Sequence, residues 1–524
     1  MTVLGALFVG VALVGLLLRR DRVVAVALGA AAAFPQSAGV ALGSVAPVPV
    51  FVCVAAVAAV GGLLTRDPRR FPSGFGLLVV FALFAWTWTV LGPWVFEGAL
   101  VLGPRGGLNN PERVLVPLGW SETNLTQSVI LLAALCAVFF LARTGTALFT
   151  LEVSVWTCVA ASFVREPLRL AGADVLAPYI DTLNAWYAVY EVRWRGVFSE
   201  PSLLAGFATA VVVFSAARAL TTGSARTRVA SVVLAAAAAV LLVGAGAGTG
   251  AVAMIVIAPT AGVLLVVRFV RSGGKGAPWY VLGALVAVLA ALTVGSTAVS
   301  GVVEVVTAKV GTNSQVSRGG SDTIGLDLLL HTVGLGVGLG GNRSSSFAVS
   351  LLSTVGVVGS VLFIAVVVAA VRGAHREPTR VAAAAGLLAL LVAKAVALPD
   401  LGDPLLWLLL AASWPGRGSV GSDPCDGVEW AGPASATSPS RTSRATPSTS
   451  PAWSPTHPRP SPHSRPSPGT RPASPRGTSP RRRAATPRAS TQRPCSPCGR
   501  PSWCGPTRSS TPRTACGAGG TTPV

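Results

Sequence analysis

Long continuous apolar runs recur along residues 1–415 and decide the fold class. A helix needs about 20 apolar residues to cross a bilayer, whereas the strands of a membrane β-barrel would show alternating polarity. Only 12% of the residues are charged, against about 25% in a typical soluble domain. The sequence therefore predicts an all-α polytopic integral membrane protein with about 12–13 transmembrane helices.

The apolar runs also predict where the spans lie. The last run is short, and we expect it to be tilted or joined to its neighbour. The membrane domain predicted in this way covers residues 1–416. We expect spans near residues 2–18, 23–46, 48–64, 75–96, 128–142, 148–164, 201–218, 229–246, 250–270, 278–297, 349–371, 381–398 and 404–415.

The placement of arginine predicts the orientation of the chain. The positive-inside rule makes short loops rich in Lys and Arg cytoplasmic. Such loops alternate along the chain, at 19–22, 66–70, Arg143, 218–228, 268–275 and 372–380. We therefore expect the N-terminus outside, together with three longer and more polar segments at 97–127, 165–200 and 298–348.

Composition changes abruptly after the last predicted span. Residues 417–524 are rich in Ser, Pro, Arg and Thr, and they carry fifteen arginines against three acidic residues. We expect this tail to be disordered, so the net charge of +21 does not indicate nucleic-acid binding. Two interpretations stay open: a basic tail held against anionic lipids, or a frameshift product beginning between Gly416 and Ala431. Cys495 and Cys498 lack an ordered scaffold, so we expect no metal site.

The longest polar interruption in the apolar chain runs from Arg318 to Gly356. We expect any chemistry there and in its partner stretch, residues 193–202. The segment Gly336-Val-Gly-Leu-Gly-Gly341 matches G-x-G-x-x-G. A dinucleotide site would also require a preceding strand and an acidic residue about 20 positions further on, within a βαβ unit. None of these is present, and we reject that interpretation.

Two other interpretations of the glycine run stay open. Alternating glycines allow backbone with φ > 0 and close approach, and successive amides can form an anion nest. The helix expected from about Phe347 would begin beside Arg343, with the positive end of its dipole facing the same place. Together these features would suit a diphosphate at the outer membrane interface. The alternative is a flexible, close-packed turn.

Further candidates lie in or beside the predicted external loops. Pro201 suits the first position of a helix, and Glu200 before it is either a cap, a base or a ligand of an acceptor sugar. His331, near Asp322 and Asp327, is either structural or a proton-transfer group. The weaker candidates are Asp174 and Asp181, and Lys394 is an intramembrane charge that is either functional or snorkels from the end of a span.

Several of these motifs resemble the O-antigen polymerase and ligase superfamily of polytopic glycan-assembly enzymes. The resemblance covers roughly residues 190–410. It rests on Arg195-Gly-Val-Phe-Ser-Glu-Pro-Ser202, on Ser317-Arg318 followed by Gly334-Leu-Gly-Val-Gly-Leu-Gly340, on Leu351-Leu-Ser-Thr-Val-Gly-Val-Val-Gly359 and on Asp403-Pro-Leu-Leu-Trp407.

The resemblance implies a multi-pass plasma-membrane transferase that needs no metal or cofactor and uses a glycan on an undecaprenyl-diphosphate carrier. Other glycan-assembly proteins would be its partners. Arg195 and Arg318 match the family's external arginines, thought to hold the diphosphate or sugar, and Arg343 is a looser match. We expect Arg193, Arg195, Arg318, Arg343, Gly336 and Gly338 to bind substrate. We expect Glu200, Asp322 or His331 to orient or deprotonate the acceptor hydroxyl.

The sequence also departs from the family pattern. Ligases usually place a His-Asn pair just after the glycine motif, where this chain has Arg343-Ser-Ser-Ser346, which favours a polymerase over a ligase. The arginine expected between two middle spans is missing from Gly246-Ala-Gly-Thr-Gly250. The main alternative function is a flippase or transporter, but that class requires charged residues at the bilayer midplane and inverted repeats. Only Lys394 fits that pattern. An inactive structural membrane protein is the third interpretation.

Overall fold

A computed structural model describes residues 1–414, apart from residues 43–44, 67–68, 73, 104–114, 184–192, 272–312, 376 and 397–398. Chain contacts divide the protein into Met1–Asp426 and Gly427–Val524. The predicted tail at 417–524 and the predicted span at 278–297 lie outside the described residues. Everything below concerns the first unit.

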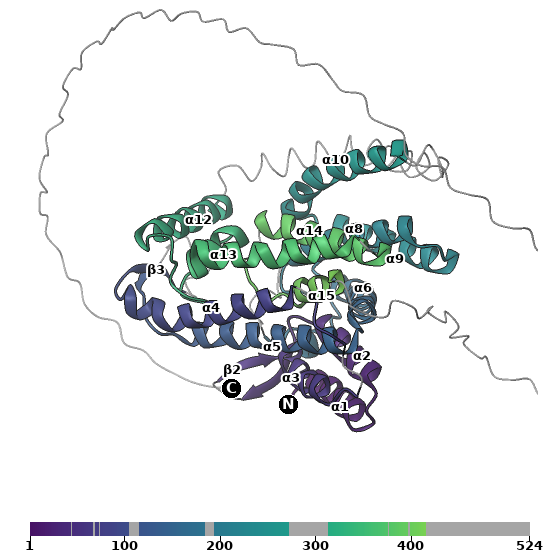
Figure 1. The fold of residues 1–524 in the computed structure, drawn as a ribbon, viewed down its shortest axis with the longest axis horizontal. Helices are drawn as coiled ribbons and strands as arrows, with labels where there is room; N and C mark the ends of the chain where they lie inside the picture. The colour runs from purple at the N-terminus through teal and green to yellow at the C-terminus, as the bar shows by residue number, and fades with distance from the viewer. Residues whose placement is uncertain are drawn as a thin grey trace, which may run out of the picture. The chain divides into compact units, whose positions relative to one another are not determined.

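The described chain is almost entirely helical (Figure 1). Two short antiparallel strand pairs interrupt the helices, namely β1 (Ala38–Leu42) with β2 (Val45–Pro49) and β3 (Leu100–Leu102) with β4 (Leu115–Pro117). The helices are α1 (Val3–Leu17), α2 (Asp21–Ala32), α3 (Val50–Leu64), α4 (Phe75–Val95), α5 (Glu122–Thr144), α6 (Ala147–Leu170), α7 (Ala177–Ile180), α8 (Pro201–Thr221), α9 (Ala225–Ala245), α10 (Gly248–Arg271), α12 (Asn313–His331), α13 (Phe347–Ala374), α14 (Pro378–Val396) and α15 (Pro404–Ser413).

Seven of the described helices are long and apolar enough to cross a membrane: α4, α5, α6, α8, α9, α13 and α14. Shorter apolar helices are α1, α3, α15 and the described start of α10. Each of the seven coincides with a predicted span. The chain is therefore an all-α polytopic membrane protein, as the apolar runs predict.

The predicted span at 23–46 is wrong. Helix α2 has 12 residues, which gives a length of about 18 Å, too short for a bilayer. Proline and glycine then stop the helix, and the chain turns back as the β1–β2 hairpin. The hairpin returns to the start of α1, where Thr2 donates through its backbone N–H to Gly39 O at 3.1 Å and through Oγ1 to Ala38 O at 2.5 Å. Helix α3 therefore leaves from the end at which α1 begins, and the later alternation is unchanged.

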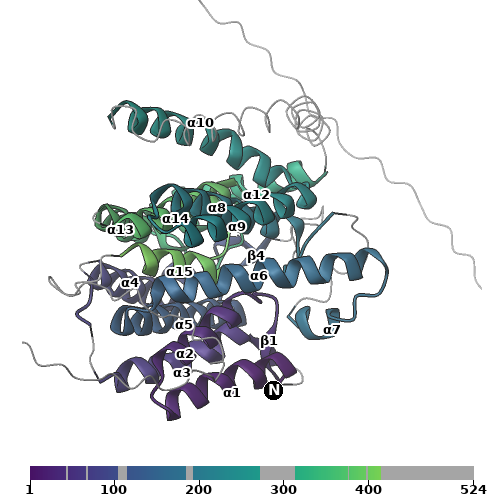
Figure 2. The ribbon, with the colours of Figure 1, turned by 90° about the vertical axis from the view of Figure 1, so that its right-hand side faces the viewer.

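The helices pack in two groups around α15, as Figure 2 shows. Helices α1, α2 and α3 pack with α5 and α6, while α8 packs against α9 and α14, and α13 packs against α4 and α14. All ten residues of α15 are buried. The indole Nε1 of Trp407 donates to Leu401 O at 2.8 Å. The last predicted span is thus a short internal helix enclosed by longer ones.

The arginine-rich loops lie at one end of these helices. The backbone N–H of Arg69 donates to Arg143 O at 2.9 Å, and the Arg143 guanidinium lies 5.5 Å from the ring centroid of Phe71. Arg218 at the end of α8 forms an ion pair with Glu152 at the start of α6. The opposite end collects the starts of α5, α8, α13 and α15. The position of these arginine-rich loops agrees with the alternation of the sequence.

Candidate functional site

A break inside α13 shapes the candidate site. Gly356 has φ +69°, which interrupts the helical backbone. The N–H of Val357 then donates to Gly334 O at 2.8 Å instead of to a carbonyl of its own helix. The released carbonyls of Ser353 and Thr354 accept from the N–H groups of Val337 and Gly338 at 3.0 and 2.8 Å. The glycine-rich loop is therefore joined to α13 by exchanged backbone hydrogen bonds, which keeps these groups satisfied.

The alternating glycines adopt the conformation that the sequence predicts. Positive φ values are found at Gly334 (+80°), Gly336 (+77°), Gly338 (+91°) and Gly340 (+74°). A Cβ on Gly338 would lie 2.7 Å from Thr89 Cα of α4, and one on Gly340 would lie 2.6 Å from Thr123 O of α5. The loop therefore lies directly against the backbones of α4 and α5, where only glycine fits.

The amides of this loop are already engaged. Gly336 N–H donates to Thr332 Oγ1 at 3.0 Å, and Gly338 N–H donates to α13. Leu339 N–H donates to Thr89 Oγ1 at 2.9 Å. These hydrogen bonds favour the close-packed turn over the anion nest. They assign Gly336 and Gly338 to positioning the loop rather than to direct contact with a ligand.

Asp322 of α12 lies at the start of α13. Its Oδ1 accepts from Ser345 N–H at 2.8 Å and from Ser346 N–H at 3.1 Å. A carboxylate there is stabilised by the positive end of the helix dipole. The sequence predicts a bound diphosphate at the start of α13, but the Asp322 carboxylate already provides part of the negative charge there. Asp322 acts as a cap in the structure, and it ties α12 to α13.

The same loop presents Arg343 to solvent. The residues on either side, Asn342 and Ser344, are buried, while the Arg343 side chain is exposed. Asn342 Oδ1 accepts from Leu102 N–H at 3.1 Å, and its Nδ2 donates to Ser344 Oγ at 3.1 Å and to Ser353 Oγ at 3.2 Å. This network fixes the backbone from which Arg343 projects.

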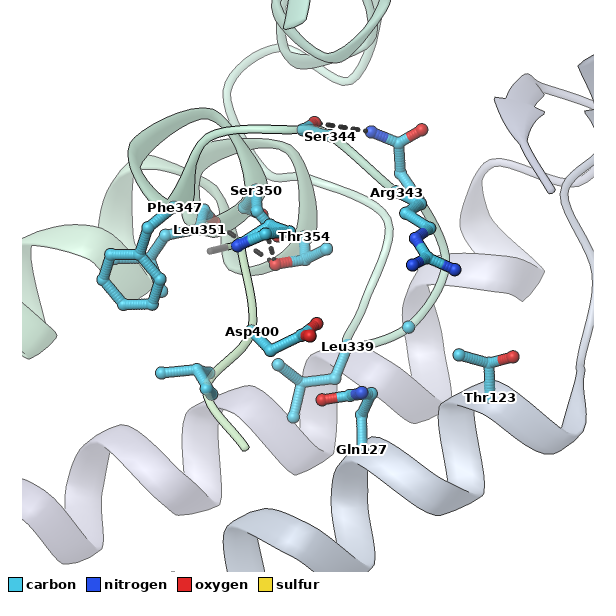
Figure 3. A pocket seen from close by; sticks show the side chains of 14 residues that line it. Thr123, Gln127, Leu339, Arg343, Ser344, Phe347, Ser350, Leu351, Thr354 and Asp400 are labelled. Atoms are coloured by element: carbon cyan, nitrogen blue, oxygen red, sulfur yellow. Dashed lines mark hydrogen bonds between the residues drawn. The ribbon is translucent and has the colours of Figure 1, made fainter. Parts of the chain in front are cut away.

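Arg343 lines a pocket of about 180 Å³ at this end of the helices. We call it the arginine pocket. Its walls are Thr123 and Gln127 of α5, the glycine-rich loop, the first two turns of α13 and residues 399–401. Figure 3 shows the side chains of Arg343, Gln127 and Asp400 turned toward the same space. The pocket combines one cation, one carboxylate and the starts of two helices.

A second pocket of about 210 Å³ adjoins it and shares Gln127 and Asp400 with it. We call it the lysine pocket, because Lys394 lines it. Its other polar side chains are Gln36 and Asp403. The remaining walls come mainly from apolar residues at the start of α3, in α5 and in and just before α8, among them Phe51, Phe198, Leu203 and Phe207.

Lys394 is buried near the end of α14, with 1% of its side chain exposed. Its Nζ lies 3.5 Å from Asp403 Oδ2 and 5.4 Å from the ring centroid of Phe347. Asp403 in turn caps α15, because its Oδ1 accepts from Leu405 N–H at 3.0 Å. This charge does not snorkel to the surface. It joins α14, α13 and the start of α15.

Arg195 has a different position from the one expected. It is 3% exposed, and its Nη2 lies 2.7 Å from Asp181 Oδ2. Arg165 of α6 is fully buried and reaches Asp174 at 2.8 Å and Asp181 at 2.5 Å. Buried Glu166 accepts from the backbone N–H of Arg195 at 2.7 Å. This buried ion cluster ties the end of α6 to the segment before α8, and it lines neither pocket.

The remaining predicted residues near α8 also lie outside the two pockets. Arg193 is exposed, and its carbonyl accepts from Arg169 Nη2 at 2.7 Å. Glu200 occupies the N-cap position of α8, with Pro201 first in the helix, as predicted. Its Oε2 accepts from Ser202 Oγ at 3.0 Å.

His331 and Arg318 belong to α12. His331 is exposed, and its Nδ1 lies 2.7 Å from Asp327 O. The side chain of Arg318 lies outside the described residues, so its expected role stays a prediction. The helix itself is divided into flanks at about 100° per residue. Ser321, Gly325, Leu328 and Thr332 are buried, Leu326 and Leu330 form an exposed apolar flank, and Thr323, Asp327 and His331 form an exposed polar flank.

Such a division is typical of a helix that lies in a membrane interface. Leu328 packs in a small cluster with Val101 and Leu118, beside Phe96 at the end of α4. Exposed Trp94 and Trp120 lie close to this cluster in sequence, and tryptophan is enriched at membrane–water boundaries. We therefore predict that α12 lies at one membrane surface.

Within the described residues, no group of three or more His, Cys, Asp or Glu side chains is arranged to hold a metal ion. The two residues shared by the pockets, Asp400 and Gln127, were missed by sequence reasoning. The available signal was the polar break at residues 399–403 between two apolar runs. Compared with known proteins, the chain matches no family model, no curated protein and no solved structure.

Proposed function

We propose that the protein is a plasma-membrane glycan polymerase. It transfers an undecaprenyl-diphosphate-linked oligosaccharide to an acceptor sugar hydroxyl at the outer face of the membrane. The observation that carries the proposal is the position of Arg343. A rigid glycine-rich loop holds this arginine in a polar pocket at the end of the helices opposite the arginine-rich loops.

The pocket fits the chemistry of a diphosphate leaving group. A guanidinium binds phosphate oxygens through two parallel hydrogen bonds and keeps its charge at all relevant pH values. The start of α5 adds the positive end of its dipole, whereas that of α13 is partly offset by Asp322. During transfer the acceptor oxygen bonds to the anomeric carbon, and the bond from that carbon to the diphosphate breaks. The growing negative charge on the diphosphate is then stabilised by Arg343.

The site in this proposal differs from the one that the sequence predicts. Arg343 takes the role expected of Arg195, because Arg195 is committed to buried carboxylates. Arg318 and Arg193 stay proposed contacts for the outer part of the substrate. Glu200, Asp322 and His331 line neither pocket, and Asp400 is the carboxylate that lies beside Arg343.

A lipid-linked-sugar flippase is the second candidate. It is favoured by one observation, the ion pair of buried Lys394 with partly exposed Asp403 between α14 and α15, since intramembrane charges often mark transport pathways. The location of the accumulated substrate separates the two. A strain without the polymerase accumulates single repeats outside the cell, whereas a strain without the flippase accumulates them inside.

The proposal is tested by the size profile of the surface glycan. Deletion of the gene should remove long chains, and Arg343→Ala should fail to restore them although the protein is present in the membrane. Arg372→Ala, at the opposite end of α13, is the matched control and should restore normal lengths. Unchanged chain lengths in the deletion strain would reject the proposed function.

A further inference from the structure

The two pockets share a single carboxylate, Asp400. We infer that the lysine pocket binds the acceptor sugar and that Asp400 is the catalytic base between acceptor and donor. This inference rests on the proposed function, because it places the second substrate of the same reaction. Its first support is connectivity. Asp400 and Gln127 line both pockets, so a group in one lies next to a group in the other.

The second support is the chemistry of the lysine pocket. Sugars are bound by amides and carboxylates that meet their hydroxyls, and by aromatic rings that cover their apolar faces. The lysine pocket combines the polar side chains of Gln36, Gln127 and Asp403 with apolar walls that include Phe51 and Phe198. A diphosphate suits the arginine pocket better, since the guanidinium of Arg343 can bind two phosphate oxygens at once.

The third support is the placement of Asp400 itself. Its side chain is exposed, and in Figure 3 its carboxylate enters the arginine pocket on the side away from Ser344. The segment that carries it is held just after Asp400 by two contacts. Asp403 pairs with Lys394, and the indole of Trp407 donates to Leu401 O at 2.8 Å.

The proposed step is balanced in atoms and charge. The acceptor O–H gives its proton to a carboxylate oxygen of Asp400 while the acceptor oxygen bonds to the anomeric carbon of the donor. The electron pair of the broken carbon–oxygen bond leaves with the diphosphate beside Arg343. Asp400 afterwards returns the proton to solvent, which its exposure permits.

The test uses the full chain in membrane vesicles from the producing strain, supplied with the strain's own lipid-linked repeat. A positioned base contributes about 100-fold or more to rate, so Asp400→Asn should slow chain growth by roughly that factor. Bound repeat should be retained. Asp400→Glu should recover part of the rate. Asp327→Asn, on the exposed polar flank of α12, is the matched control and should behave like the wild type.

A second variant tests the pocket separately. Val52→Trp fills the lysine pocket and should shorten the chains with normal membrane insertion, whereas Val26→Trp on the exposed side of α2 should not. Wild-type rates in both Asp400→Asn and Val52→Trp would overturn the inference. That result is distinguishable from failure of the proposed function, because in the latter case deletion of the gene itself leaves the glycan unchanged.

Discussion

Arg195 and Asp181 form a buried ion pair, with Nη2 2.7 Å from Oδ2. Arg165 shares the same carboxylate at 2.5 Å. Since the pair is desolvated, removing one partner leaves an uncompensated buried charge. The pair connects the end of α6 to the segment before α8. Its loss should therefore lower the free energy of unfolding before it affects substrate binding.

Arg195→Ala should therefore lower the free energy of unfolding by about 3–5 kcal/mol. The measurement is the thermal midpoint of the purified protein in detergent. Arg193→Ala, two residues away and exposed, should leave the midpoint nearly unchanged. A stable Arg195→Ala protein that has lost only substrate binding would instead support the ligand role that the family resemblance implies.

Gly356→Ala should disrupt the contact between α13 and the glycine-rich loop. A Cβ at this position would lie 2.3 Å from Leu335 O, and φ is +69°. We expect a loss of more than about 1 kcal/mol in unfolding free energy. Gly76→Ala in α4 is the control, because a Cβ there meets nothing within 4 Å, and alanine should stabilise that helix by up to about 1 kcal/mol. Equal midpoints for the two variants would show that the break is dispensable.

Asp322→Ala should remove the cap of α13, at a cost of about 0.5–2 kcal/mol. Asp322→Asn should recover part of the loss, because an amide oxygen still accepts from Ser345 and Ser346. Thermal unfolding and glycan length are measured on the same variants. Should both variants unfold like the wild type and make no long glycan, Asp322 would be a catalytic group, as the sequence predicts, rather than a cap.

Helix α12 should contact lipid along one flank only. Leu330 is 75% exposed on the apolar flank, and Asp327 lies on the polar one. Fluorescent labels attached to single cysteines at these positions, in a background without native cysteines, report the contact. Lipids with a quencher in the acyl chain should dim the label at position 330 more than the label at 327. Equal quenching at both positions would place the helix away from the interface.

Much of this arrangement follows from local chemistry that the sequence displays. Continuous apolar runs predict the seven long spans, and alternating glycines predict the positive φ values from Gly334 to Gly340. Pro201 predicts the start of α8. Each of these features depends on steric and hydrophobic effects between residues that are close in the sequence.

Most of the errors come from contacts between residues that are separated in the sequence. The sequence around Arg195 does not indicate that its guanidinium pairs with Asp181, which Arg165 also contacts. Nor does the sequence around Asp322 indicate that this carboxylate caps α13, 24 residues further along the chain. The wrong span at 23–46 has a local cause instead, because its residues are apolar but Pro35 and Gly39 break the helix. Asp400 could not be identified from the sequence, because it lines both pockets only where the loop before α15 packs against α5 and α13.

The most direct test of the central claim is binding of a short-chain polyprenyl diphosphate to the purified protein in lipid nanodiscs. Losing a bidentate contact between an arginine and a phosphate costs about tenfold or more in affinity. Arg343→Ala should therefore bind at least about tenfold more weakly than the wild type, and Arg372→Ala should bind equally well. Equal affinity of the wild type and Arg343→Ala would contradict the account.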